Sequence, residues 1–151
     1  MSINYQKLTN QDLPLLKELI QIFEVVFEME DFVLPNDTHL QSLLDNESMI
    51  FWVVMLEEHK TKKVIGGLRG YILPSVYYAS SEMYLYDLGV HLNFQRKGIG
   101  TKLMENLKEY SKNLGYKELF VQADLEDEHA IDFYKKTGGK AADVIHFSYE
   151  L

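Results

Sequence analysis

Cysteine is absent from this sequence of 151 residues. Disulfide bonds, cysteine-based metal sites and a thiol nucleophile are therefore excluded, and nothing in the composition suggests secretion. Apolar runs long enough to span a membrane are also missing, and the N-terminus lacks a basic segment followed by an apolar one. The histidines show no spacing typical of metal ligands. We expect a cytoplasmic protein without a bound metal.

Positive charge is scarce: 15 Lys and Arg residues face 23 Asp and Glu residues, for a net charge of −8 at pH 7. Non-specific binding of nucleic acid needs a basic face, so this balance argues against it. The same balance favours a cationic small molecule or a cationic protein tail as partner. Solubility is the ordinary explanation of such acidity, and composition alone supports both.

The pattern of apolar residues predicts a mixed α/β fold in one domain, residues 1–151, because the length suits a single core. Helices are expected at 9–29, 37–44, 99–114 and 127–136. Strands are expected at 3–8, 49–56, 64–74, 82–90, 119–124 and, as a last strand, 141–149. The alternation of strands and helices in the second half predicts parallel neighbours. Gly66-Gly67 indicates a bulge or a close approach of backbones.

The segment from Gln95 to Thr101 is a basic, glycine-rich turn between a strand pattern ending at Val90 and a helix pattern. Such a turn presents free backbone N–H groups and the positive end of a helix dipole, which together bind anions. Gly98 and Gly100 allow a ligand to approach the backbone because no Cβ intrudes. The ordinary alternative is a surface turn whose charge serves solubility.

Gln95-Arg-Lys-Gly-Ile-Gly100 resembles the acetyl-coenzyme A loop of the GCN5-related N-acetyltransferase (GNAT) superfamily, Gln/Arg-x-x-Gly-x-Gly/Ala. Ala130-Ile-Asp-Phe-Tyr-Lys-Lys-Thr-Gly138 resembles that family's Ala-x-x-x-Tyr-x-x-x-Gly helix. The resemblance implies a mixed central sheet of six to seven strands, flanked by about four helices, in which two central parallel strands splay apart. In the family the pantetheine arm lies in that gap, and Gly89 is a candidate for the bulge that opens it.

Three short segments, 84–88, 121–124 and 144–147, resemble the aminoglycoside 3-N-acetyltransferases within this superfamily. The resemblance implies transfer of acetyl from acetyl-coenzyme A to an amine of a gentamicin-type antibiotic. A polyamine or a protein amino group stays open as the acceptor, and so does a noncatalytic acyl-coenzyme A sensor. Members of the family are often dimers, so a homodimer is expected, with the aromatic tail 147–149 as a candidate contact.

The resemblance also implies the cofactor contacts, which are Leu88, Val90, Gln95, Arg96, Lys97, Gly98, Ile99, Gly100, Thr101, Asp127 and Tyr134. Asp127 departs from the family's usual Asn, and a carboxylate cannot donate the hydrogen bond that an amide donates to pantetheine. Gly139 departs from the apolar residue common there. Tyr134 matches the tyrosine beside the sulfur and is the expected general acid for the departing thiolate. The alternative for Tyr134 is a core tyrosine.

The general base stays open among Glu82, Asp87 and Asp124. Asp is disfavoured inside a strand, so Asp87 either holds a substrate ammonium or pairs with Arg69 or a tyrosine. Asp124 either faces the gap or caps the helix that follows. An acidic patch draws a polycation, with an attraction that salt weakens. The expected acceptor-binding residues are Asp87, Asp124, Glu126 and Glu128.

Overall fold

The computed structural model describes residues 1 to 151 and contains one five-stranded sheet in the order β1-β2-β3-β4-β5. The strands are β1 (Ser2–Lys7), β2 (Met49–Glu58), β3 (Thr61–Pro74), β4 (Ser81–Val90) and β5 (Leu119–Val121). The helices are α1 (Leu13–Val26), α2 (Asp37–Asp45), α3 (Ile99–Asn113) and α4 (Glu128–Lys136), with a 3-10 turn η1 (Leu92–Phe94). The predicted α+β architecture with four helices is confirmed. No helix combines the length and apolar composition needed to cross a lipid bilayer.

The sheet is mixed. β1, β2, β3 and β4 are antiparallel neighbours, whereas β4 and β5 run parallel. The parallel pairing covers only Met83–Leu85 of β4 and Leu119–Val121 of β5. Beyond Leu85, β4 continues to Val90 without a strand on that side. The two parallel strands thus part as expected, and the end of β4 is left open to a ligand.

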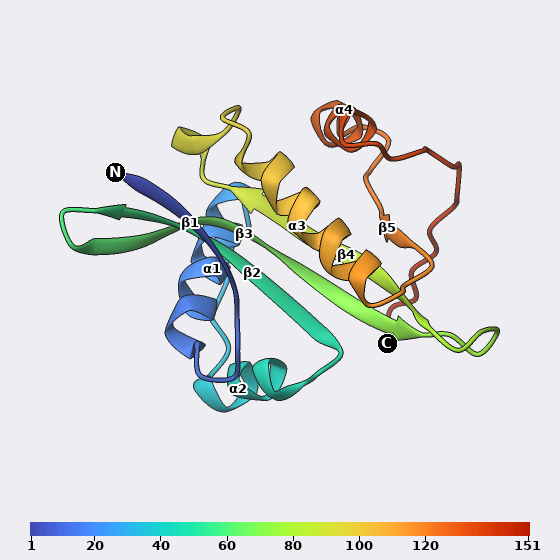
Figure 1. Ribbon diagram of the computed structural model, residues 1–151, viewed down its shortest axis with the longest axis horizontal. Helices are drawn as coiled ribbons and strands as arrows, with labels where there is room; N and C mark the ends of the chain where they lie inside the picture. The colour runs from blue at the N-terminus through green and yellow to red at the C-terminus, as the bar shows by residue number, and fades with distance from the viewer.

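Helices cover both faces of the sheet (Figure 1). On one face, Leu16 and Leu19 of α1 and Leu40 of α2 are buried against the strands. On the other, α3 buries a stripe at helical spacing, formed by Ile99, Leu103 and Leu107. Because Ile99 is the first residue of α3, this packing fixes the end of the glycine-rich turn against the core.

Gly67 lies where β2 and α1 come too close for a side chain. A Cβ at Gly67 would lie 2.2 Å from the Trp52 carbonyl oxygen and 2.5 Å from Leu19 Cδ1. The pairing of β2 with β3 also shifts register beside Gly66, between Val54 and Met55. Of the two alternatives predicted for Gly66-Gly67, the close approach is confirmed, whereas the extra residue of the irregularity is the neighbouring Ile65.

Gly89 does not mark the bulge in β4, and that prediction is wrong. The register shifts between Leu85 and Asp87, so Tyr86 is the extra residue. A Cβ at Gly89 would lie 3.2 Å from Phe23 Cδ1. Gly89 therefore serves the packing of α1 on the end of β4.

The start of α1 differs slightly from the expectation. The helix begins at Leu13, and Asp12 occupies the N-cap position predicted for Thr9. The Asp12 carboxylate accepts hydrogen bonds from the Thr9 N–H at 2.7 Å and from its hydroxyl at 3.1 Å. The two residues interact as predicted, but in the turn before the helix. Pro14 lies in the first turn, where its missing N–H costs little.

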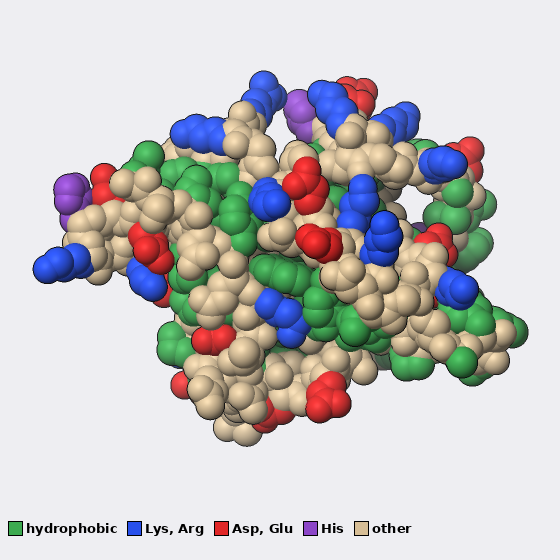
Figure 2. All heavy atoms as spheres, in the orientation of Figure 1, with side chains coloured by type: hydrophobic (Ala, Val, Ile, Leu, Met, Phe, Trp, Pro, Cys, Tyr) green, Lys and Arg blue, Asp and Glu red, His purple; other side chains and the backbone are tan.

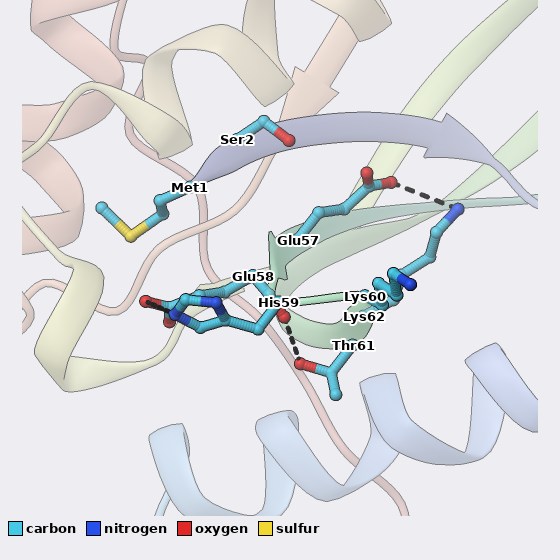
Figure 3. A pocket seen from close by; sticks show the side chains of 8 residues that line it. All are labelled: Met1, Ser2, Glu57, Glu58, His59, Lys60, Thr61 and Lys62. Carbon is cyan, nitrogen blue, oxygen red and sulfur yellow. Dashed lines mark hydrogen bonds and ion pairs between the residues drawn. The ribbon is translucent and has the colours of Figure 1, made fainter.

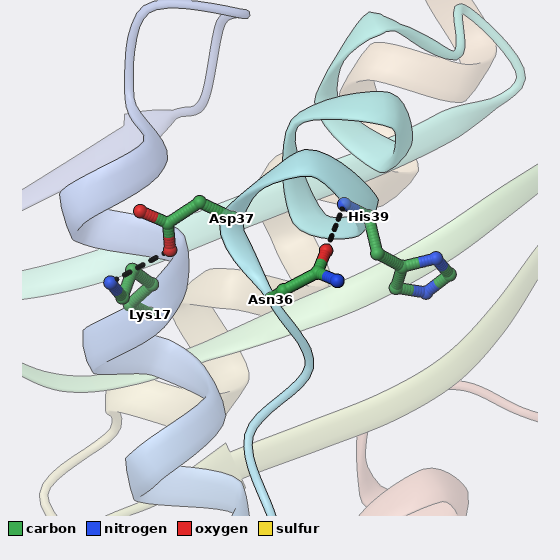
Figure 4. A network of polar contacts seen from close by, with 4 residues as sticks. All are labelled: Lys17, Asn36, Asp37 and His39. Atoms are coloured by element: carbon green, nitrogen blue, oxygen red, sulfur yellow. Dashed lines mark hydrogen bonds and ion pairs between the residues drawn. The ribbon is translucent and has the colours of Figure 1, made fainter.

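α2 begins at Asp37, as predicted, and its first turn is held by two polar contacts (Figure 4). Asn36 Oδ1 accepts a hydrogen bond from the His39 N–H at 2.9 Å, which caps the helix. Lys17 Nζ of α1 lies 2.9 Å from Asp37 Oδ1. The pair joins α1 to α2 at the surface.

The segment from Lys140 to Leu151 does not form the expected last strand. It contains no helix or strand, and none of its backbone groups hydrogen-bonds within the chain. Figure 1 shows it running from α4 past β5 to the C-terminus, and Figure 2 shows an open gap between it and the body. The sheet therefore has five strands instead of six to seven, because this segment reaches no strand edge of its own chain.

Candidate functional site

A groove of ≈ 680 Å³ lies beside the unpaired end of β4. Its walls come from the end of β4, the loop after it, the first turn of α3, one side of α4, and Val26 at the end of α1. Of the cofactor contacts predicted from the sequence, all except Lys97 line this groove. Phe94, His129 and Phe133 also line it, and no spacing in the sequence singled these three out.

The loop between η1 and α3 has an unusual backbone. Arg96 has φ 59° and Gly98 has φ 80°, both in the left-handed region. Glycine adopts this conformation freely, whereas it costs arginine roughly 1 kcal/mol or more. None of the backbone N–H groups from Arg96 to Thr101 donates a hydrogen bond within the chain. A row of free N–H groups at the start of a helix is an anion site.

Gln95 and two glycines shape this loop. Gln95 Nε2 donates a 2.8 Å hydrogen bond to the Val90 carbonyl, which ties the loop to the end of β4. A Cβ at Gly98 would meet nothing within 4 Å, so the space over the loop is open. A Cβ at Gly100 would lie 3.3 Å from the Phe133 ring, so Gly100 lets α4 pack close to α3. Gln95 thus positions the loop, and Gly98 keeps it accessible.

Positive charge gathers near this loop although the protein is acidic overall. Figure 2 shows Lys and Arg side chains along the edge of the molecule above η1, α3 and α4. Arg96 lines the groove. Lys97 does not, because its Nζ lies over the Phe94 ring, 5.6 Å from the centroid. The lysine nevertheless adds positive charge beside the free N–H groups.

Tyr134 of α4 lines the groove and is half-buried. Its hydroxyl has no hydrogen-bond partner in the chain, and since no buried side-chain N or O atom is left unpaired, the hydroxyl is accessible. Burial, together with the smaller effect of the Asp127 and Asp87 carboxylates, raises the pKa of Tyr134 to about 12. The hydroxyl therefore keeps its proton at neutral pH and is free to donate it.

Asp127 is the N-cap of α4. Its Oδ1 accepts a 3.0 Å hydrogen bond from the Ala130 N–H, and the residue also lines the groove. One carboxylate oxygen is thereby engaged with the helix. Asp127 thus takes the capping role that the sequence had offered to Asp124.

Asp87 pairs with Arg69 on β3, the alternative that the sequence left open. Arg69 Nε and Nη2 lie 2.7 Å and 2.6 Å from the same oxygen, Asp87 Oδ2. Burial raises the pKa of the Asp87 carboxyl above its usual value, although the Arg69 guanidinium pulls in the opposite direction. Oδ1 has no partner in the chain and is accessible, since no buried polar atom is unpaired. The carboxylate can therefore hold Arg69 and a second cation at once.

Aromatic rings surround this ion pair, and sequence reasoning missed them. The Arg69 guanidinium lies 4.2 Å from the centroid of Tyr86 and 5.6 Å from that of Tyr71. The Tyr84 ring stacks on Phe120 of β5 with centroids 4.7 Å apart. Tyr84 and Tyr86 are two residues apart in β4, a spacing that could have indicated one shared aromatic face. This face of the sheet is built to pack against flat or apolar groups.

The other predicted acidic residues are not gathered at the groove. Asp124, Glu126 and Glu128 are exposed in and after the turn that follows β5, and none of them lines the groove. Glu82, a candidate base, accepts a 2.8 Å hydrogen bond from the Tyr78 hydroxyl at the start of β4. The structure thus brings Asp127 and Tyr134 together with the loop and leaves the acidic patch at its margin.

A second, smaller hollow of ≈ 250 Å³ lies at the tip of the β2–β3 hairpin beside Met1 (Figure 3). Its charged side chains pair with each other, as in the 3.2 Å contact of Lys62 with Glu57. His59 and Lys60 form the turn, both at positive φ. The hollow is polar and lies at the far edge of the sheet, so it is a feature of the turn. No three His, Asp or Glu side chains are grouped to hold a metal ion.

Residues 15–139 match the acetyltransferase (GNAT) family. The chain belongs to this family. Among curated proteins, an N-alpha-acetyltransferase of Sulfurisphaera tokodaii is 25% identical over 123 residues, covering 72% of this chain and 74% of that protein. The chain is therefore a GNAT-family N-acetyltransferase, as the loop and the Ala130–Gly138 helix predicted.

Two solved structures are more similar to this chain than this relative is, both in sequence identity and in the share of the chain that they cover. An aminoglycoside acetyltransferase, meta-AAC0020, from an uncultured soil metagenomic sample is 39% identical, with a TM-score of 0.93 over 99% of this chain and 96% of that chain. It was solved in complex with sisomicin and with trehalose. A second soil metagenomic aminoglycoside acetyltransferase, HMB0005, is 33% identical, with a TM-score of 0.88 over 100% of this chain and 99% of that chain.

Membership of the GNAT family implies an acyl-coenzyme A cosubstrate, and the groove fits it. The free N–H groups from Arg96 to Thr101 suit a diphosphate. The unpaired side of β4 suits an extended arm carrying amide groups. When bound, such a cosubstrate supplies an activated acyl group as a thioester.

Proposed function

We propose that this chain transfers the acetyl group of acetyl-coenzyme A to an amine of an aminoglycoside, at its 3-amino group. The observation that carries the proposal is the likeness, over nearly the whole of both chains, to an acetyltransferase solved with sisomicin. An overall negative charge and exposed carboxylates beside the groove support a polycationic acceptor. All residues from 1 to 151 act as one N-acetyltransferase domain in this proposal.

The loop binds the diphosphate in this proposal. The N–H groups from Arg96 to Thr101 donate to its oxygens, Arg96 and Lys97 offset its charge, and Gly98 leaves room for the approach. Leu88 and Val90 provide backbone groups for the pantetheine arm on the open side of β4. The Val90 carbonyl already accepts from Gln95, so Val90 contributes its N–H. This fixed placement brings the reacting groups together.

Tyr134 is the general acid. The amine nitrogen bonds to the acetyl carbonyl carbon, the carbon–sulfur bond breaks, and the Tyr134 hydroxyl gives its proton to the sulfur. A pKa of about 12 keeps the hydroxyl protonated until that moment. The tyrosinate regains a proton that originates from the amine. A backbone N–H near Val90 stabilises the negative charge that develops on the carbonyl oxygen.

Asp87 holds the acceptor. Its Oδ1 is accessible while Oδ2 is paired with Arg69, so it can accept from a substrate ammonium without losing that pair. The aromatic face of Tyr84 and Tyr86 offers a surface for sugar rings. Asp124, Glu126 and Glu128 attract the polycation from the margin. Asp87 and Asp124 are the candidates that receive the amine proton, directly or through water.

Thiol release from acetyl-coenzyme A tests this proposal with five amines: sisomicin, gentamicin, kanamycin, spermidine and a lysine peptide. We expect kcat/KM for sisomicin or gentamicin to exceed that for the peptide by at least roughly 100-fold. Two-dimensional NMR of the product should place the new amide on the 3-amino group. A higher kcat/KM for spermidine or for the peptide would make that amine, and not an aminoglycoside, the acceptor. Tight coenzyme A binding without release from any amine would make the chain an acyl-coenzyme A sensor.

We also propose that the chain works as a homodimer. The support is the apolar and aromatic tail after α4, which is highly exposed in the single chain. Soluble monomers rarely expose a contiguous apolar patch of this kind.

A further inference from the structure

Val26 is the only residue of α1 that lines the groove, and it is the last residue of that helix. Its side chain is half-buried and packs against the apolar cluster between α1 and the sheet. Packing therefore fixes an apolar side chain at the wall of a groove whose other features are backbone N–H groups and polar side chains. No step of the reaction described above involves this residue.

The last turns of α1 close the groove at Gly89. A Cβ at Gly89 would lie 3.2 Å from Phe23 Cδ1 and 3.5 Å from Phe27 Cζ. The two phenyl rings also stack on each other, with centroids 5.3 Å apart. Rings this close to the backbone leave no space for a ligand between α1 and β4. The groove therefore ends here, at a wall formed by Val26 with the two rings behind it.

The backbone at the end of β4 shows where a thioester carbonyl fits. The His91 N–H donates a 2.8 Å hydrogen bond to the Ile65 carbonyl of β3. Successive N–H groups of a strand point to opposite sides, so the Val90 N–H points away from β3, toward the open side of β4. In the proposed reaction this N–H holds the carbonyl oxygen. The acyl carbon then lies next to Gly89 and the wall at Val26.

Only one direction is left for the acyl chain. A thioester carbon is planar and is bonded to its oxygen, its sulfur and the acyl chain. The oxygen is at the Val90 N–H, and the sulfur is beside Tyr134 of α4. Since α4 packs against α3 at Gly100, it lies on the face of the sheet opposite to α1. The acyl chain therefore points away from α4, toward Val26.

We propose that Val26, backed by Phe23 and Phe27, limits the length of the acyl group, so that acetyl is accepted and longer acyl groups are excluded. The inference rests on the coenzyme A site of the proposed function and is independent of the acceptor amine. Each methylene beyond acetyl has to displace Val26. Because the rings behind it are packed against β4, the wall cannot retreat, and overfilling a packed site is costly. One methylene changes selectivity in such pockets roughly 10- to 200-fold.

Calorimetry with free coenzyme A, acetyl-coenzyme A and butyryl-coenzyme A tests the proposal without any acceptor. The wild-type protein should bind butyryl-coenzyme A at least roughly 10-fold more weakly than acetyl-coenzyme A. Val26→Ala shortens the side chain at the wall and should reduce this difference to less than about threefold, through tighter binding of the butyryl compound. Free coenzyme A carries no acyl group, so its affinity is the internal reference for each variant.

A larger side chain at the same position should have the opposite effect. Val26→Phe should weaken the binding of acetyl-coenzyme A roughly 10-fold relative to free coenzyme A, because the ring occupies the place of the acetyl methyl group. Val25→Ala is the matched control, since Val25 is 54% exposed and lies outside the groove. It should leave the three affinities unchanged. Circular dichroism melting shows that each variant is folded.

Equal affinity of the wild-type protein for acetyl- and butyryl-coenzyme A overturns the proposal. So does a difference that persists in Val26→Ala, or one that Val25→Ala removes equally, or acetyl-coenzyme A binding that Val26→Phe leaves unchanged.

The proposed function and this inference fail in different ways. If free coenzyme A binds but acyl groups are not distinguished, only the limit at Val26 is wrong. If acyl groups are distinguished but no acetyl reaches sisomicin, only the proposed acceptor is wrong. Absence of coenzyme A binding would overturn both.

Discussion

The two sides of the end of β4 are built differently. On the groove side, the groups available to a ligand are mostly backbone groups, because consecutive N–H groups from Arg96 to Thr101 are free and the space over Gly98 is open. On the aromatic side, side chains from three strands converge, with Arg69 from β3, Asp87 from β4 and Phe120 from β5. A backbone site depends on one short segment, whereas a side-chain site depends on the register of the whole sheet. We therefore expect most substitutions in the loop to weaken ligand binding, whereas single substitutions on the aromatic side change its contacts one at a time.

The largest expected effect is on the groove side. Gly98→Asp should weaken acetyl-coenzyme A binding at least 100-fold, about 2.7 kcal/mol, because the carboxylate repels the diphosphate and fills its place. Calorimetry measures the dissociation constant. Gly115→Asp is a matched control, since Gly115 also has positive φ and open space around it, but at the end of α3. If both variants fold and lose the same affinity for acetyl-coenzyme A, the loss comes from backbone strain at a positive-φ position, and the loop does not bind the diphosphate.

Tyr134→Phe should lower kcat roughly 10- to 100-fold and leave the KM for acetyl-coenzyme A nearly unchanged, because only proton donation is lost. With a pKa of about 12, ionisation of Tyr134 should not reduce the wild-type kcat below pH 10. Steady-state kinetics from pH 6 to 10 measure both. Tyr116→Phe is the control, since burial raises the pKa of Tyr116 too but it lies outside the groove. An unchanged kcat in Tyr134→Phe would remove the acid role.

Asp87→Asn tests whether the aromatic side holds the acceptor. It should raise the KM for the acceptor roughly tenfold and leave the affinity for acetyl-coenzyme A unchanged, because only the ammonium contact is lost. It should also lower the free energy of unfolding by about 1–3 kcal/mol, since Arg69 loses its partner. Arg69→Met breaks the same pair but keeps the carboxylate. If both variants change stability and acceptor KM alike, Asp87 has a structural role alone.

The smallest effect belongs to the margin of the site. Glu126→Gln/Glu128→Gln should raise the acceptor KM about two- to fivefold at low salt and have little effect at 0.5 M salt, because exposed charges act over a distance that salt shortens. Steady-state kinetics at low salt and at 0.5 M salt measure this change in the acceptor KM. Glu57→Gln/Glu58→Gln removes the same charge at the β2–β3 hairpin and should have no effect. A change that persists at high salt would instead mean direct contact.

The difference between the two sides also decides what could be predicted. The glycine-rich turn is contiguous in the sequence and depends on glycine and helix position, so a local pattern was enough to select residues that line the groove. Tyr134 lies in α4 at a fixed spacing from Gly138, and a local pattern selected it as well. Lys97 was included although its amine turns to Phe94, because a local pattern does not state side-chain direction.

The aromatic side was predicted only in part, because it depends on register. The sequence offered Arg69 as a partner for Asp87, but no residue type marked the shift at Tyr86 that places the two opposite each other. Phe120 reaches Tyr84 only because β5 is parallel to β4 at this place. The last strand, predicted at 141–149, was wrong for a different reason. An alternating pattern indicates a strand, but it does not state which sheet edge the strand would reach, and this segment reaches none in its own chain.

The amide N–H groups of residues 96 to 101 are the most direct place to test the account. Titration of ¹⁵N-labelled protein with coenzyme A, and separately with 3′-dephospho-coenzyme A, follows each of these amides by NMR. Both ligands should produce the largest shifts at 96–101, since both carry the diphosphate. If these amides stay unmoved at saturation while others shift, the diphosphate is held elsewhere and the assignment of the groove is wrong.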